Sequence, residues 1–193
     1  SHTGASSVYV VYAPVVSAWG IQCASSNTVN IQNSIIGGID VTGTTSSTAS
    51  GFIGIDASGT GLFSINNNSV GNDLPDNIRT GYLLTGANLS NTAVTPTAAS
   101  GSSAVHGIRS SAVAAALTIT NNLVHGIQVS GTATAYNGIT NSGAVTGTIN
   151  LNNNQLGNID AGAVRFMFNN TGVVTGISNT GATATTTVNL NNN

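Results

Sequence analysis

The sequence predicts an all-β protein folded as a parallel β-helix, a solenoid of about five coils with one long loop insertion. Two short motifs recur together five times along the 193 residues. Their apolar residues alternate with period two, and Val, Ile, Thr, Asn and Gly dominate the composition. Period-two alternation of β-branched residues indicates strands and excludes helical repeats.

The first motif consists of two apolar residues separated by one residue, followed by a polar residue and Asn. It occupies residues 29–33, 63–67, 117–121, 149–153 and 188–192. The second motif, Gly-Ile, precedes each copy and begins at Gly20, Gly54, Gly107, Gly138 and Gly176. Successive Gly-Ile pairs lie 34, 53, 31 and 38 residues apart. A propeller blade of similar length usually carries aromatic signatures, and aromatic residues are only 5% here. A solenoid tolerates the uneven spacing, because extra residues bulge outward from a corner.

Each repeat is expected to run through the same elements in order. The Gly-Ile strand turns a corner into the strand of the first motif. A third short strand follows around Ile39, Leu74, Ile127 or Ile159, and a variable loop leads to the next repeat. Residues 75–106, with Pro75 and Pro96, are the predicted insertion loop, and residues 1–19 are strands of a preceding coil. Residues 1–193 therefore form a single β-helix segment, interpreted as a fragment of a longer chain with five repeats in 20–193.

The composition narrows the classes of function. Only 4% of residues are charged, against about 25% in ordinary domains, and the charged set is five Asp and three Arg. Hydrophobic residues make up 40%, which favours an ordered β protein over a disordered polar chain. Three scattered Arg do not provide the basic surface that nucleic acid requires. No apolar run approaches the roughly 18 residues of a membrane-spanning helix, and Cys23 stands alone, so no internal disulfide is expected.

The asparagine that ends the first motif is predicted to form a structural ladder. Strand alternation places it on the same face as the two apolar residues, pointing inward or at a corner. The ladder residues are Asn33, Asn67, Asn121, Asn153 and Asn192. Asn tolerates the left-handed backbone of a corner, and stacked amides bond from one coil to the next. A metal site would need carboxylates or His at these positions, so no metal and no cofactor is expected.

In the first motif, the residues that alternate with the apolar pair and the Asn are expected to face outward. They form a flat, uncharged strip of Asn, Gln, Ser and Thr side chains. A solvated face is the preferred interpretation, with ice or glycan binding as the alternative. Trp19, Tyr82 and Tyr136 are the aromatic residues available for stacking on sugars, although packing at the edge of a coil is preferred for each.

The motif pattern resembles the right-handed parallel β-helix repeats of secreted bacterial surface proteins. It is most similar to the Asn-, Thr- and Gly-rich repeat regions of very large Bacteroidota proteins, or adhesins, exported by the type 9 secretion system. The resemblance covers roughly residues 20–193. It implies a right-handed solenoid at the cell surface or outside the cell, but the same fold also occurs in polysaccharide lyases and hydrolases.

The few charged residues give little support to catalysis. The residue after Gly-Ile is Asp56 in one repeat and Arg109 in the next, so stacking in register predicts an exposed inter-coil salt bridge. Asp73 and Asp76 flank Pro75, where a turn is preferred to a catalytic pair. No Ser-His-Asp pairing is supported by the sequence, and no catalytic residue is assigned.

The sequence therefore predicts a non-enzymatic structural or adhesive stalk section of a secreted or cell-surface protein. Its expected partners are adjoining coils of the same longer chain, and cell-surface glycans or secretion machinery are further candidates. Nucleic acid and membrane insertion are not expected. The alternatives are a carbohydrate-active β-helix enzyme, a lyase or hydrolase, and a polar glycan- or ice-binding face.

Overall fold

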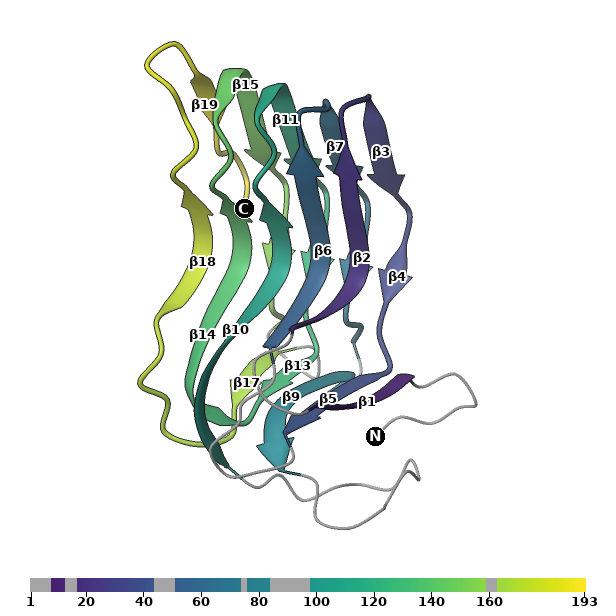
Figure 1. Ribbon diagram of the computed structural model, residues 1–193, viewed down its shortest axis with the longest axis vertical. Coiled ribbons are helices and arrows are strands. Elements are labelled where there is room, and N and C mark those ends of the chain that lie inside the picture. The colour runs from purple at the N-terminus through teal and green to yellow at the C-terminus, as the bar shows by residue number, and fades with distance from the viewer. Residues whose placement is uncertain (1–7, 13–16, 44–50, 74–75, 84–97, 159–162) are drawn as a thin grey trace.

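The computed structural model describes residues 8–12, 17–43, 51–73, 76–83, 98–158 and 163–193. Within these residues the protein is all-β, with no helix and so none that could cross a membrane. The strands form four parallel sheets, each stacked in the order of the sequence. Figure 1 shows the stack from its first strands on the right to its last strands on the left. This is the layout of a β-solenoid.

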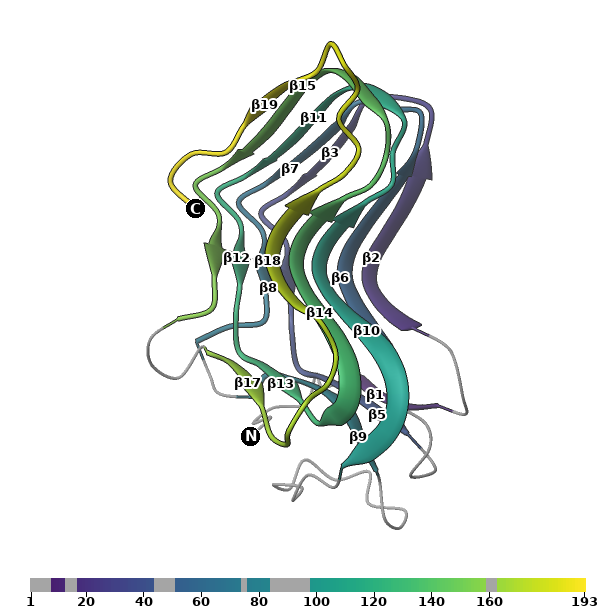
Figure 2. The ribbon, with the colours of Figure 1, turned by 90° about the vertical axis from the view of Figure 1, so that its left-hand side faces the viewer.

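We call the four sheets A to D. Sheet A contains β1 (Val8–Tyr12), β5 (Ile39–Gly43), β9 (Ile78–Leu83), β13 (Ile127–Val129) and β17 (Val164–Phe166). Sheet B contains β2 (Ser17–Ser25), β6 (Gly51–Gly59), β10 (Ala99–Ser110), β14 (Gly131–Asn141) and β18 (Val174–Asn179). Sheet C contains β3 (Val29–Gln32), β7 (Phe63–Asn66), β11 (Ala114–Thr120), β15 (Val145–Asn152) and β19 (Thr187–Asn189). Sheet D contains β4 (Ile35–Ile36), β8 (Ser69–Val70), β12 (Leu123–Val124) and β16 (Gln155–Leu156). In Figure 2, which looks along the stack, the chain passes through sheets B, C, D and A in turn.

The two sequence motifs mark the strands of sheets B and C. Gly-Ile lies within the strands of sheet B, where Ile55, Ile108 and Ile139 pair across the sheet. The apolar residues of the first motif lie in sheet C, where Ile65, Ile119 and their neighbours stack in the core. The core is therefore a set of apolar columns, and each repeat contributes one residue to each column, as the period-two alternation predicts.

The glycine is required in four of the five Gly-Ile pairs because sheets B and D approach closely at its position. The fifth, Gly176, lies in the last strand of sheet B, where a Cβ atom has room. A Cβ atom built on Gly107 would lie 2.5 Å from the Gly138 carbonyl oxygen and 2.5 Å from Cγ1 of Val124 in sheet D. No side chain fits at that separation. The alternation also resets there, so that His106 and Arg109, on either side of Gly107-Ile108, both face outward.

Two corners use residues in the left-handed backbone conformation. Between sheets C and D the five asparagines that end the first motif have φ between 54° and 57°. Between sheets D and A the corner residues are glycines, with φ of 69° at Gly38, 88° at Gly71, 62° at Gly126 and 80° at Gly157. Asn and Gly are the residues that adopt this conformation at least cost.

The corner between sheets D and A differs from the sequence prediction. The third strand begins at Ile39 and Ile127 as expected, but in two repeats it begins later, at Ile78 and Val164. The predicted positions Leu74 and Ile159 lie outside the described residues. Extra residues after Gly71 and Gly157 delay the strand, and sequence alternation does not reveal such a delay.

The predicted insertion at 75–106 is shortened at both ends by strands. β9 occupies Ile78–Leu83, and β10 begins at Ala99, so the segment contains parts of sheets A and B. Residues 84–97 lie outside the described residues. At the N-terminal end of the stack, β1 pairs with β5 in sheet A.

Replacing Gly107 with Ala tests the close approach of sheets B and D. The new methyl group would meet both a backbone oxygen and Val124, so the free energy of unfolding should fall by roughly 1–3 kcal/mol. Gly176→Ala is the matched control, because its added Cβ would meet no atom closer than Leu156 Cδ1 at 3.6 Å. Thermal unfolding of both variants measures the difference, and equal stability would contradict the packing described above.

Candidate functional site

The buried amide ladder lies at the corner between sheets C and D, one residue later than the sequence predicts. The five predicted residues, Asn33, Asn67, Asn121, Asn153 and Asn192, form the left-handed corner, and their side chains are exposed. The left-handed residue rotates the chain, so the next side chain points inward. The amides of Asn68, Asn122 and Asn154 are accordingly 1%, 0% and 2% exposed.

Every amide in this ladder bonds to the repeats on both sides. The Asn122 Nδ2 atom donates to Asn154 Oδ1 at 3.0 Å and to the Ile65 carbonyl oxygen at 2.9 Å. Its Oδ1 atom accepts from the backbone N–H and the Nδ2 atom of Asn68, both at 3.0 Å. Asn154 repeats the arrangement with Asn193, and the Ser34 backbone N–H donates to Asn68 in the first repeat. A buried polar chain that is fully bonded stabilises the fold, whereas an unpaired member would destabilise it.

The repeated Asn-Asn doublet was the signal that could have located this ladder. The second asparagine is present at positions 68, 122, 154 and 193, and only the first repeat has Ser34 instead. Of the two placements predicted for the first asparagine, inward or at a left-handed corner, the corner is confirmed. Asn192 Nδ2 also donates to Asn153 Oδ1 at 3.2 Å, so two of the predicted residues bond between repeats. The buried ladder itself is one residue later, because the left-handed residue turns the next side chain inward.

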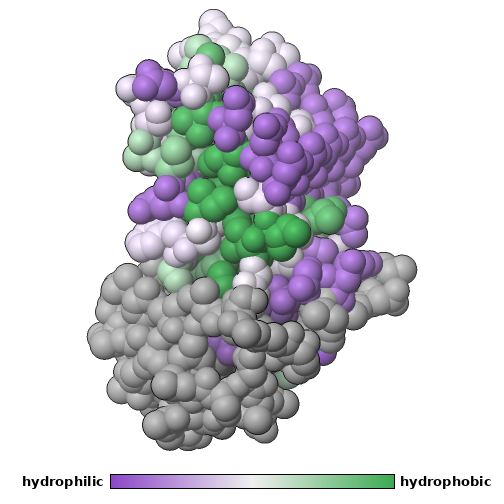
Figure 3. Space-filling view, turned by 90° about the vertical axis from the view of Figure 1, so that its right-hand side faces the viewer, coloured by the Kyte–Doolittle hydropathy of each residue, from purple (hydrophilic) through white to green (hydrophobic). Residues whose placement is uncertain are grey.

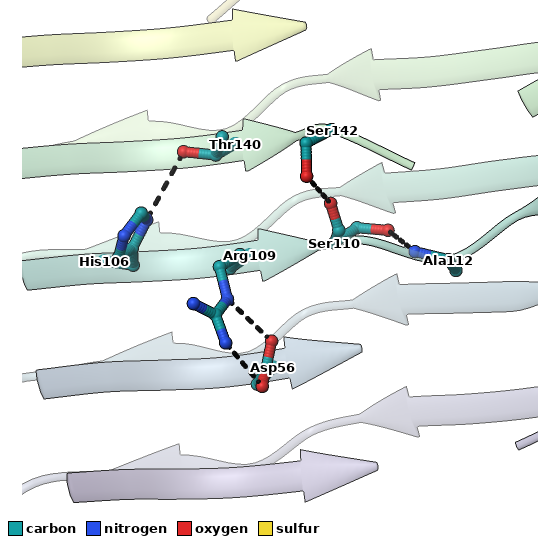
Figure 4. Close-up of polar contacts among 7 residues, drawn as sticks. All are labelled: Asp56, His106, Arg109, Ser110, Ala112, Thr140 and Ser142. Atoms are coloured by element: carbon teal, nitrogen blue, oxygen red, sulfur yellow. Dashed lines mark hydrogen bonds and ion pairs between the residues drawn. The ribbon is translucent and has the colours of Figure 1, made fainter. Parts of the chain in front are cut away.

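The second candidate site is a polar cluster on the outer face of sheet B (Figure 4). The predicted Asp56–Arg109 pair is present between β6 and β10. Arg109 Nε donates to Asp56 Oδ1 and Arg109 Nη2 to Asp56 Oδ2, both at 2.9 Å. The pair is less exposed than predicted, because the side chain of Asp56 is 5% exposed beneath the half-buried guanidinium.

His106 stands beside this pair on the same strand as Arg109. Burial, reinforced by the positive charge of Arg109 and partly opposed by Asp56, lowers the pKa of His106 to about 4. The imidazole is therefore neutral near pH 7, and its Nδ1 atom lies 3.5 Å from Thr140 Oγ1. This cluster offers one carboxylate, already bonded to Arg109, whereas glycoside hydrolysis ordinarily uses two.

All three arginines of the sequence pair with aspartates. In sheet A, Arg79 donates through Nε to Asp40 at 2.6 Å, and both side chains are less than 10% exposed. Arg165 bonds to Asp76 at 2.7 Å near the corner between sheets D and A. Asp76 therefore has an ion-pair partner that the turn interpretation did not predict.

The sequence pattern supports no Ser-His-Asp pairing, yet the structure brings one such set together. Ser69, His125 and Asp73 meet at the corner between sheets D and A. By contrast, no three His, Cys, Asp or Glu side chains of the described chain are grouped as metal ligands.

The aromatic candidates for sugar stacking are separated. Tyr136 is 4% exposed and packs edge-to-face on Phe166, with ring centroids 6.2 Å apart. Trp19 is exposed on β2, at the first edge of sheet B, and the side chain of Tyr82 lies outside the described residues. Cys23 is a free thiol packed against the core.

Comparison of the chain with protein-family models, curated proteins and solved structures finds no match. The resemblance to exported bacterial repeat regions therefore remains a prediction.

Asn122→Ala should destabilise the protein on the order of 3 kcal/mol, because it leaves the Asn68 N–H and the Ile65 carbonyl without their buried partner. Asn121→Gly is the matched control. It keeps a residue suited to the left-handed corner and removes only an exposed side chain, so its effect should stay within about 0.5 kcal/mol. Chemical denaturation measures both values. The reverse order of effects would assign the structural role to Asn121.

Stability should fall as the pH is lowered from about 6.5 to about 4. His106 binds a proton in the unfolded chain at its ordinary pKa near 6.5, but in the folded protein only near 4, so acid favours the unfolded state across this window. Burial also lowers the pKa of His125, which adds to the effect. Melting temperatures measured across this range for the wild type and His106→Gln test the assignment. An unchanged pH slope in the variant would show that His106 is not responsible.

Proposed function

We propose that this chain is a structural, adhesive section of a rod at the cell surface or outside the cell, in the form of a right-handed β-helix with five coils in residues 20–193. Its mechanism is mechanical and not enzymatic. Hydrogen bonds along one axis hold successive repeats together, and the resulting rod presents its loops or a distal domain. The resemblance to repeat regions exported by the type 9 secretion system supports an extracellular place.

The single observation that carries this proposal is the continuous bonding between repeats. Backbone hydrogen bonds pair the strands along all four sheets. The amide ladder adds a series of side-chain hydrogen bonds that runs from the Ser34 backbone to Asn193. Solenoid repeats are stabilised mainly by contacts with their neighbours. Load applied along the stack is therefore shared between repeats, as a stalk requires.

The surface chemistry is also suited to a rod. The three Arg–Asp pairs neutralise one another within the molecule. The outer face of sheet C carries Asn, Gln, Ser and Thr side chains, and several bond to each other, such as Asn189 to Asn150 at 2.8 Å. We keep the solvated face as the interpretation of this uncharged strip, with adhesion to glycans as the alternative.

We propose that adjoining coils of a longer chain are the main partners of this segment. Support comes from apolar side chains exposed at both edges of the stack. At the first edge Ile35 is 80% exposed beside Trp19, and Figure 3 shows the apolar band that crosses this face. At the other edge Val173 and Val174 are 70% and 59% exposed. Further strands in the same register would bury both groups and pair the backbone edges.

Single-molecule stretching tests the rod proposal. The chain is placed between two marker domains and pulled from both ends. A stack held by neighbour contacts should unravel repeat by repeat, and repeats of 31 to 53 residues should each release roughly 110 to 190 Å of chain. Asn122→Ala should lower the force of the steps around that repeat, while Asn121→Gly should leave it unchanged. Rupture of the whole chain in one event would overturn the proposal.

A further inference from the structure

A serine, a histidine and an aspartate from two repeats form a relay at the corner between sheets D and A. Ser69 lies in β8, and its Oγ atom is 2.9 Å from Nε2 of His125, which follows β12. The other ring nitrogen, Nδ1, is 3.2 Å from Oδ1 of Asp73. Such an order, hydroxyl to imidazole to carboxylate, is the arrangement that activates a serine for nucleophilic attack.

Asp73 determines which nitrogen of His125 carries the proton. Its carboxylate only accepts hydrogen bonds, so Nδ1 must donate to it, and Nε2 is left as an acceptor facing Ser69. The Ser69 hydroxyl then has two acceptors within reach, this Nε2 atom and the Gly71 carbonyl oxygen at 2.9 Å. Burial lowers the pKa of His125 and the nearby Asp73 partly opposes the change, so the ring is neutral and available as a base near pH 7.

Ser69 has apolar neighbours on the outer face of sheet D. Ser69 pairs with Ile35 on one side and Leu123 on the other, in the outward-facing row of sheet D. Their side chains are 80% and 38% exposed. Ser69 itself is half-buried between them. A short apolar acyl group placed over this row would contact both side chains while its carbonyl carbon approaches Ser69.

We propose that Ser69 is a self-acylation site that takes an acyl group from a carboxylic ester. Ser69 Oγ forms a bond to the carbonyl carbon while its proton passes to His125 Nε2. The bond from that carbon to the alkoxy oxygen of the ester then breaks, and His125 returns the proton to the departing alkoxide. The products are an acyl-serine and an alcohol, and His125 ends neutral, as it began. This inference is independent of the rod function.

The surroundings favour a lasting acyl-serine over rapid turnover. An oxyanion hole uses free N–H donors, and the loss of one donor typically costs about 10²–10³ in rate. Here the backbone N–H groups of Ser69, Gly71, Leu123 and His125 all donate to carbonyl oxygens of the neighbouring repeat on the N-terminal side. The general base alone contributes about 10²–10⁴. The second step, attack by water, proceeds without oxyanion donors as well, and an alkyl ester of serine is a poorer acyl donor than an activated ester, so the acyl group should persist.

The experiment exposes the purified chain to p-nitrophenyl acetate at pH 7.5 and locates the acetyl group by intact-mass and peptide mass spectrometry. We expect one acetyl group on Ser69, formed about 10² times faster than on other serines. Ser69→Ala should remove it. Ser142→Ala is the matched control, because Ser142 is exposed and its Oγ bonds only to the Ser110 carbonyl oxygen, so labelling should not change.

Two further variants separate activation from a structural role. His125→Gln should slow acetylation of Ser69 by about 10²–10⁴. Asp73→Asn should shift the pH at which labelling begins to a lower value, because Asp73 raises the pKa of His125 and the reaction needs the neutral ring. Acetyl groups spread over several serines of the wild type, or Ser69 labelling that is unchanged in His125→Gln, would overturn the proposal. Because the wild-type map decides the site directly, it remains valid even where a variant unfolds.

Discussion

The rest of the structure depends on one constraint, which is that buried polar groups need hydrogen-bond partners, and many of them find these in the adjacent repeat. Among the described residues, the buried atoms Tyr136 Oη and Asn141 Oδ1 have no such partner. The amide ladder meets the constraint with a single residue type. Each asparagine offers two N–H donors and an oxygen with two lone pairs, and Asn122 uses all of them towards its neighbours and the backbone. The ladder joins neighbouring repeats along the corner between sheets C and D, from the Ser34 backbone to Asn193. A side chain that could not both donate and accept hydrogen bonds would interrupt the ladder at its own repeat.

The same constraint explains how so few charges are distributed. A charged residue in a stacked column places like charges about 4.8 Å apart in successive repeats, unless the next repeat supplies the opposite sign. Asp40 with Arg79 and Asp56 with Arg109 are such pairs of neighbours in register. Uncharged amides and hydroxyls stack without this restriction. Low charge is therefore a property of the fold and needs no separate functional cause.

The sequence predicts those parts of the structure that repeat in step with it. Gly-Ile and the apolar pair locate sheets B and C, and their register alone predicts the Asp56–Arg109 pair. The ladder was assigned one residue early, because a left-handed asparagine interrupts the alternation on which the assignment rests. The strands at Ile78 and Val164 were missed, because the corner between sheets D and A varies in length. The repeat register pairs Ser69 with Leu123, two residues before His125, but alternation does not show that the side chains of Ser69 and His125 turn towards each other.

Side chains that could do chemistry lie both on sheet B, where His106 stands beside the Asp56–Arg109 pair, and at that variable corner, where Ser69, Asp73 and His125 meet. Within a sheet, stacking places each residue over its counterpart in the next repeat, and the backbone groups are used in pairing between strands. A side chain in a sheet therefore meets mainly the side chains of its own column. At the corner between sheets D and A, residues added in one repeat reach side chains of another. Asp73 there contacts His125, and Asn158 donates to the same carboxylate at 3.4 Å, while Asp76 reaches Arg165. The stack can therefore keep its bonding between repeats unchanged while its corners acquire new contacts, and a reactive serine would arise at a corner of this kind.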